Sequence, residues 1–154
     1  MKPPHPLTPS PLHLFDGLRG ENEVTYAAQH MPEAWFLFLD APDFVRVQRL
    51  LRRNDDFDQV VTRKNESISL DPALTGWLDD QQLAHLEYFI RQGELIPENV
   101  QAKLTIVQTE RQNYDPDATL AALRQFAPDR LLYADTTKLS PDQIAQIITN
   151  ELSA

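Results

Sequence analysis

The clearest hydrophobic pattern in the chain is a continuous apolar run. From Trp35 to Leu39 the sequence reads Trp-Phe-Leu-Phe-Leu, with no polar residue between. An alternating pattern would predict a strand with one solvated face, whereas a continuous run predicts a strand that is buried on both faces. We therefore expect a central strand of a parallel sheet here, covered by helices on both sides.

A helix with two distinct faces is predicted to follow this strand, from about Pro42 to Arg53. Proline suits a first helical turn, where its missing N–H costs little. At about 100° per residue the apolar positions share one side; they are Phe44, Val47, Leu50 and Leu51. Three arginines, Arg46, Arg49 and Arg53, fall on another side within a stripe about 60° wide.

This arginine stripe begins just after the carboxyl end of the predicted strand, where open α/β sheets bind ligands. Guanidinium groups are planar and always charged, which suits them to phosphate oxygens. The alternative is a solvated basic face whose alkyl stems cover the rim of the core. The pattern leaves both interpretations open.

The rest of the chain predicts further helices and two more strands. The predicted strands are Leu12–Phe15 and Leu131–Ala134; the predicted helices are Asn22–Met31, Asp71–Leu78, Asp79–Gln92, one from Pro97, one capped by Asp115-Pro116, and one from Ser140. Residues 1–11 are rich in proline and predict an extended or disordered leader. Because helices flank every strand, we expect an α/β domain over residues 12–154. Its first part, residues 12–39, should form a right-handed β-α-β unit. Residues 59–126 should form a helical, lid-like insertion.

Each predicted strand ends in an aspartate: Asp16, Asp40 or Asp135. The carboxyl ends of parallel strands meet at one sheet edge, so these acids should lie close together. Carboxylates there can hold Mg²⁺ or accept a proton from a substrate hydroxyl. The alternative, which we favour for Asp40 and Asp135, is that they cap the following turn. For Asp16 both interpretations stay open.

Composition narrows the classes of function. The chain has 154 residues, 23 acids against 14 Lys and Arg, and a net charge of −9, so no broad basic field exists for nucleic acid or an anionic membrane. There is no cysteine, which excludes disulfides and Cys-ligated metals. No run approaches membrane-spanning length and no apolar signal core is present, so we expect a soluble, cytoplasmic protein.

Four motifs together resemble a known family. They are L-H-L-F-D-G-L-R over residues 12–19, F-L-F-L-D-A-P over 36–42, R-L-L-R-R-N-D over 49–55, and L-L-Y-A-D-T-T-K-L-S-P-D-Q-I-A-Q-I-I over 131–148. They resemble the second half of a P-loop kinase or small AAA-type ATPase, in particular the nucleotide-kinase-like and dephospho-coenzyme-A-kinase-like proteins. The resemblance covers residues 12–58 and 130–152.

The resemblance implies a three-layer parallel sheet and an ATP-dependent small-molecule phosphotransferase that uses ATP and Mg²⁺. It implies that Asp16 ends the Walker B strand, as a catalytic residue and metal ligand. Arg49 and Arg53 match the catalytic arginines of the helix that leads into the lid. The remaining nucleotide-binding positions that it implies are Arg19, Arg46, Arg63, Asp135 and Lys138.

The phosphate-binding loop of that family is missing from this sequence. A Walker A loop reads G-x-x-x-x-G-K-[ST], and its backbone N–H groups and lysine hold the phosphates. None of the four glycines here precedes Lys-Ser or Lys-Thr, and no strand, loop and helix precede Asp16. We therefore expect a sheet that is incomplete on its N-terminal side. The missing strand would lie between residues 12–15 and 35–39, which should pair directly or accept another chain.

Two functions stay open. The first is a partial P-loop kinase-like protein that binds a nucleotide or a phosphorylated small molecule and is inactive as this isolated chain. Such a chain would be a truncated reading frame or half of a split protein. The second is a non-catalytic protein-interaction or anion-binding module on a degenerate kinase scaffold.

Overall fold

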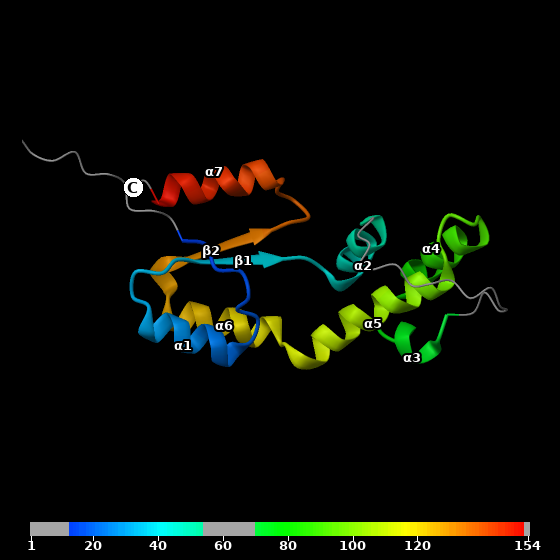
Figure 1. Ribbon diagram of the computed structural model, residues 1–154, viewed down its shortest axis with the longest axis horizontal. Coiled ribbons are helices and arrows are strands. Elements are labelled where there is room, and N and C mark those ends of the chain that lie inside the picture. The colour runs from blue at the N-terminus through cyan, green and yellow to red at the C-terminus, as the bar shows by residue number, and fades with distance from the viewer. Residues whose placement is uncertain (1–12, 54–69, 153–154) are drawn as a thin grey trace, which may run out of the picture.

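The computed structural model describes residues 13–53 and 70–152, and it confirms the α/β class in its coarse sense (Figure 1). Two five-residue strands, β1 (Phe36–Asp40) and β2 (Leu131–Asp135), pair in parallel. The helices are α1 (Glu21–His30), α2 (Asp43–Arg52), α3 (Pro72–Thr75), α4 (Asp80–Arg91), α5 (Pro97–Asn113), α6 (Pro116–Phe126), the short 3₁₀ helix η2 (Pro128–Arg130) and α7 (Pro141–Leu152).

The sheet has only two strands in the described part of the chain, so the predicted three-layer P-loop-kinase sheet is not present. The predicted strand over residues 12–15 is wrong where it is described. Residues 13–19 have no regular structure, and Leu14 and Phe15 are 90% and 76% exposed. The segment pairs with no strand in the described structure and its apolar side chains are not packed, so it lacks both features that stabilise a strand. The part of the chain that the structure describes therefore contains no β-α-β unit and no pairing of residues 13–15 with β1.

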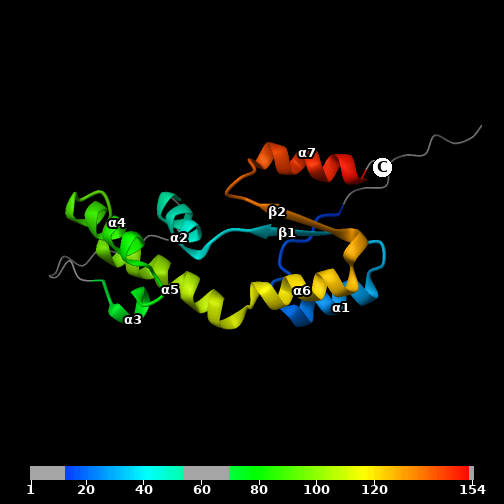
Figure 2. The ribbon, with the colours of Figure 1, turned by 180° about the vertical axis from the view of Figure 1, so that it is seen from behind.

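Packed helices bury one face of the sheet, whereas leucines on the other face stay exposed. Helices α1 and α6 lie on one side of the strands, and α7 lies on the other (Figures 1 and 2). The first hydrophobic cluster joins α1, β1 and α6 through Val24, Ala27, Ala28, Phe36, Ala122, Leu123 and Ala127. On the opposite face Leu37 and Leu39 are 37% and 57% exposed. The prediction that this strand is buried on both faces is thus wrong, because α7 buries none of its own residues.

A second hydrophobic cluster lies beyond the carboxyl ends of the strands, among α2, α3, α4 and α5 (Figure 1). Its buried residues are Val47, Leu70, Leu86, Ile90, Val100, Leu104 and Val107. Phe44, Leu50 and Leu51 pack against them, which confirms the predicted apolar face of α2. Helix α6 belongs to the first cluster, although the sequence analysis placed it within the helical insertion.

Local capping explains where the helices begin and end. The side chain of Asp79 accepts from the N–H of Gln82, and Asp115 accepts from the N–H groups of the first turn of α6. The predicted capping box of the last helix is confirmed, because Ser140 and Gln143 bond each other's backbone N–H at 2.8 and 3.3 Å. Gly93 follows α4 with a φ of 75°, a conformation that favours glycine.

Candidate functional site

The carboxyl ends of β1 and β2 bring two predicted acids together. Asp40 and Asp135 are register partners, as the parallel arrangement predicted. The backbone N–H of Thr136 donates to the carbonyl of Asp40 at 2.9 Å, and the Thr136 hydroxyl donates to the same oxygen at 2.8 Å. Asp16 does not join them at a strand end, because it lies exposed in the segment without regular structure.

Both strand-end carboxylates are engaged by neighbouring groups. The hydroxyl of Tyr133 donates to Asp40 Oδ2 at 2.5 Å, and this bond raises the pKa of Tyr133 above its ordinary value. Asp135 accepts from Lys138 Nζ at 2.8 Å and from the N–H and hydroxyl of Thr137 at 2.9 and 2.6 Å. These bonds, that of Lys138 first, lower the pKa of Asp135 to about 2. Asp135 therefore caps the turn after β2, as the alternative interpretation held.

Arg49 of the arginine stripe reaches this turn. Its guanidinium donates to the hydroxyl of Thr136 and to the Thr136 carbonyl, each at 2.7 Å. The helix after β1 is thereby tied to the end of β2. This contact occupies the side chain that the resemblance assigned to phosphate.

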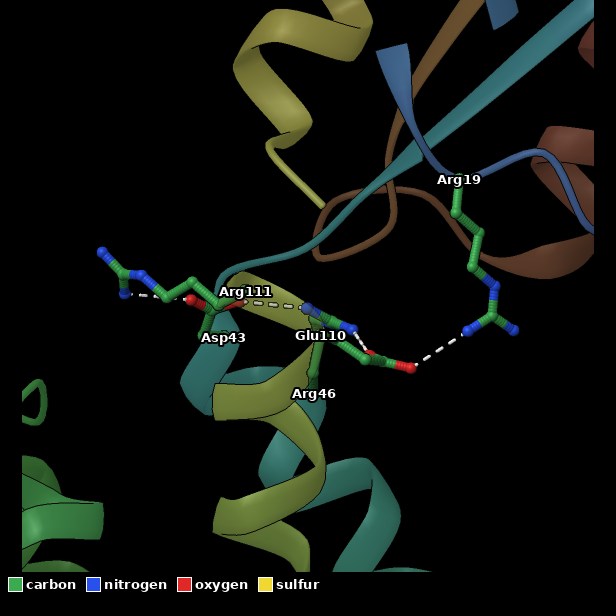
Figure 3. A network of polar contacts seen from close by, with 5 residues as sticks. All are labelled: Arg19, Asp43, Arg46, Glu110 and Arg111. Atoms are coloured by element: carbon green, nitrogen blue, oxygen red, sulfur yellow. Dashed lines mark hydrogen bonds and ion pairs between the residues drawn. The ribbon is translucent and has the colours of Figure 1, made fainter. Parts of the chain in front are cut away.

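Arg46 is also occupied, within a network of alternating charges (Figure 3). It donates to Asp43 Oδ1 at 3.1 Å and to Glu110 Oε2 of α5. Arg19 donates to Glu110 Oε1, and Arg111 donates to Asp43 Oδ2, each at 3.1 Å. Three arginines thus share two carboxylates, and the side chains are between 26% and 58% exposed.

The third member of the stripe is Arg53, whose exposed side chain makes no polar contact within residues 13–53 and 70–152. Arg63 lies outside the described residues. The structure thus brings Arg46 and Arg19 to the same carboxylate, that of Glu110, and Arg49 to Thr136, the residue after Asp135, but it does not gather the three arginines of the stripe around one site. The sequence analysis missed Thr136, Glu110 and Asp43 as partners of these arginines.

The described residues fit Mg²⁺ and nucleotide phosphates poorly. No group of three or more His, Cys, Asp or Glu side chains that could hold a metal occurs among them. A hollow of about 350 Å³ lies at the N-terminus of α1, lined by Gly20, Glu21, Asn22, Glu23, Asn113, Tyr114 and Asp115. Its three acids repel phosphate, so this hollow is no substitute for a phosphate-binding loop.

The outer edge of β1 is the most distinctive feature of the strand region. Because the Asp40 carbonyl accepts from Thr136, the residue after its register partner, the backbone N–H and C=O of Asp40 point toward β2. Backbone groups alternate along a strand, so those of Leu37 and Leu39 point away from β2. No strand pairs with that edge in the described structure. Leu37 and Leu39 thus combine exposed apolar side chains with backbone groups available for another strand.

Comparisons with models of protein families, with curated proteins and with solved structures found no match to this chain. No helix in the described ranges is long and apolar enough to cross a membrane.

Proposed function

We propose that this chain is a non-catalytic protein-interaction module whose open β1 edge accepts a strand from another chain. The observation that carries the proposal is the outer edge of β1, where Leu37 and Leu39 present apolar side chains and outward backbone groups. Addition of a strand to such an edge is a common mode of recognition, in which main-chain hydrogen bonds supply affinity.

A sheet of two parallel strands is incomplete by itself. Parallel strands occur almost only in sheets that are covered on both faces, and two isolated strands are marginally stable. An exposed apolar edge also invites uncontrolled association, which proteins normally prevent with charges, prolines or bulges. Between residues 35 and 39 β1 has none of these features, and only Asp40 at its end is charged. Completion of the sheet by a partner strand removes each of these problems together.

The polar contacts at the strand ends favour interaction over catalysis. Asp40, Asp135, Arg46 and Arg49 are held by partners within the chain, and Asp16 stands apart from them. Phosphoryl transfer needs positioned cations around the transferred group, and the cradle that supplies them is missing from the sequence. The four side chains named above instead hold helices, strands and turns of this chain in place.

A strand-forming peptide tests the proposal directly. The probe is Lys-Thr-Val-Thr-Val-Thr-Lys, and its matched control is the same peptide N-methylated at every residue from the first threonine to the last, so that neither edge of the peptide can donate main-chain hydrogen bonds. The proposal predicts that the probe shifts the backbone NMR signals of Leu37 and Leu39, whereas the control does not. Equal effects of the two peptides, or no effect of either, would refute strand addition.

One observation favours a second candidate, a partial nucleotide-binding protein related to P-loop kinases. The arginine-bearing helix α2 stands at the carboxyl ends of two parallel strands, beside Asp40 and Asp135. Ligands of open α/β sheets bind at this place. In this candidate the phosphate loop comes from another chain, Asp16 and Mg²⁺ act only in that complex, and Arg19, Arg49, Arg53 and Lys138 contact ATP. It is tested by the nucleotide titration described in the Discussion.

A further inference from the structure

We infer that the strand accepted by the β1 edge is β1 of a second copy of this chain, paired antiparallel about a two-fold axis at Phe38. This inference rests on the proposed function and identifies the partner. Its basis is the match between β1 and itself in register, hydrogen bonding and charge.

The centre of β1 (Phe36–Asp40) reads Leu-Phe-Leu, which is the same in either direction about Phe38. With the axis at Phe38, Leu37 lies opposite Leu39 of the second copy, and Leu39 lies opposite Leu37. These are the two exposed leucines of the strand, at 37% and 57%. Directly opposed side chains on one face of an antiparallel pair are about 5 Å apart, so each leucine gains an apolar neighbour.

Leu37 and Leu39 also carry the outward main-chain groups of β1. Their N–H and C=O groups point away from β2, as the bond from Thr136 to Asp40 requires. In an antiparallel ladder, opposed residues of this kind exchange both main-chain bonds. The register about Phe38 therefore satisfies the outward groups of Leu37 and Leu39 in both copies. A register displaced by one residue would oppose Leu37 to Phe38, which belongs to the other face of the strand.

The charges at the two ends of β1 support an antiparallel partner. Asp40 is the only charged residue of the strand, and in this register it lies opposite Phe36 of the second copy. The guanidinium of Arg130 sits over the Phe36 ring at 5.6 Å, so each Asp40 approaches a positive charge. A parallel copy would instead place Asp40 beside another Asp40, next to Asp135. Like charges directly opposed across a ladder are destabilising.

The antiparallel arrangement separates the helical parts of the two copies. Helices α2 to α5 extend beyond the carboxyl ends of the strands (Figure 1). In an antiparallel pair the two carboxyl ends point in opposite directions, so these helical parts lie far from each other. Each copy carries a net charge of −9, which opposes association at a distance. Added salt screens this repulsion, so the dimer should strengthen as ionic strength rises.

Cysteine crosslinking tests the register, because the chain has no cysteine of its own. Leu37→Cys and Leu39→Cys are prepared separately. Each variant is oxidised alone, and an equal mixture of the two is oxidised in parallel. In the proposed register, a dimer of one Leu37→Cys chain and one Leu39→Cys chain places the two cysteines directly opposite each other, at a separation that a disulfide can span. Each variant alone places them diagonally, at about 7–8 Å, beyond that span. Leu14→Cys mixed with Leu39→Cys reports random collision, since Leu14 is 90% exposed and outside β1.

The expected result is a crosslinked dimer from the Leu37→Cys and Leu39→Cys mixture only. Light scattering of the unmodified chain should give twice 17.7 kDa, and Leu39→Lys should restore the monomer mass. A monomer mass at all salt concentrations, or equal crosslinking by single variants and the mixture, would overturn the inference. A monomer that still binds the Lys-Thr-Val-Thr-Val-Thr-Lys peptide would overturn the second copy as partner and leave the strand-accepting edge intact. A monomer that binds neither would overturn both.

Discussion

Arg49 and Thr136 join the helix that follows β1 to the turn that follows β2, through two hydrogen bonds of 2.7 Å. The two residues belong to different parts of the molecule, because α2 packs in the second hydrophobic cluster and β2 pairs with β1. The two clusters share no residue. The Arg49–Thr136 contact is therefore one of the ties that hold the two parts together.

Removing this tie should destabilise the chain modestly. We expect Arg49→Ala to lower the free energy of unfolding by about 1 kcal/mol, the usual net contribution of a hydrogen bond. Arg52→Ala is the matched control, since Arg52 is an exposed arginine of the same helix whose side chain makes no polar contact in the described structure. Urea unfolding followed by circular dichroism measures both. Equal stability of the two variants would show that the tie contributes nothing.

The charge network around Glu110 should make stability depend on salt in a recognisable way. Glu110 accepts from Arg19 and Arg46, and partly exposed ion pairs each contribute about 1 kcal/mol or less. Glu110→Gln should cost more stability at low salt than at high salt. Glu87→Gln removes the same charge from an isolated pair with Arg91 on α4 and is the control. If both variants respond alike to salt, the network adds nothing beyond net charge.

The turn after β2 should contribute a pH dependence at acid pH. The folded-state pKa of Asp135 is lowered to about 2 from an ordinary value of 3.8. Its ionised form is thus favoured by folding, and this stabilisation is present above about pH 4 and lost as pH falls toward 2. Carboxyl NMR titration should show that Lys138→Ala raises the pKa more than Thr137→Val does, because the Lys138 bond is the larger cause. An unchanged pKa in both variants would contradict this.

The second candidate function predicts weak nucleotide binding by the arginine stripe. Two charge-assisted contacts leave little net affinity after the cost of association, so we expect a dissociation constant in the millimolar range that rises with salt. The purified chain should not hydrolyse ATP with Mg²⁺. An NMR titration with ATP, repeated on Arg49→Ala and Arg53→Ala, measures this. The candidate would be removed if ATP caused no shifts around residues 46–53. It would also be removed if both variants bound ATP as tightly as the unmodified chain does.

Local patterns predicted the helices well. Spacing of apolar residues and capping residues such as Asp79, Asp115 and Ser140 are properties of neighbouring positions, so the sequence alone indicated helix starts. The parallel pairing of Asp40 with Asp135 also followed from the order of strands and helices. An apolar helix face does not reveal its partner surface, however. For this reason α6 could not be placed beneath the sheet from its periodicity.

The contacts that decide the site are not local. Arg46 meets Glu110 from a distance of 64 residues along the chain, and Arg49 meets Thr136 from 87 residues away. Periodicity placed these arginines on one face but gave no sign of their partners. The strand predicted at residues 12–15 is not formed at residues 13–15 for a related reason: pairing with a distant strand is not set by the local pattern of apolar residues.

Amide hydrogen exchange at Leu37 and Leu39 tests the central claim most directly, with Phe38 as the internal reference. The amide of Phe38 faces β2, whereas those of its two neighbours face the open edge. We predict that exchange at Leu37 and Leu39 slows when the chain is concentrated or when the strand peptide is added, while exchange at Phe38 changes little. Fast exchange at Leu37 and Leu39 under every condition would contradict the account, because it would show that no strand pairs with this edge.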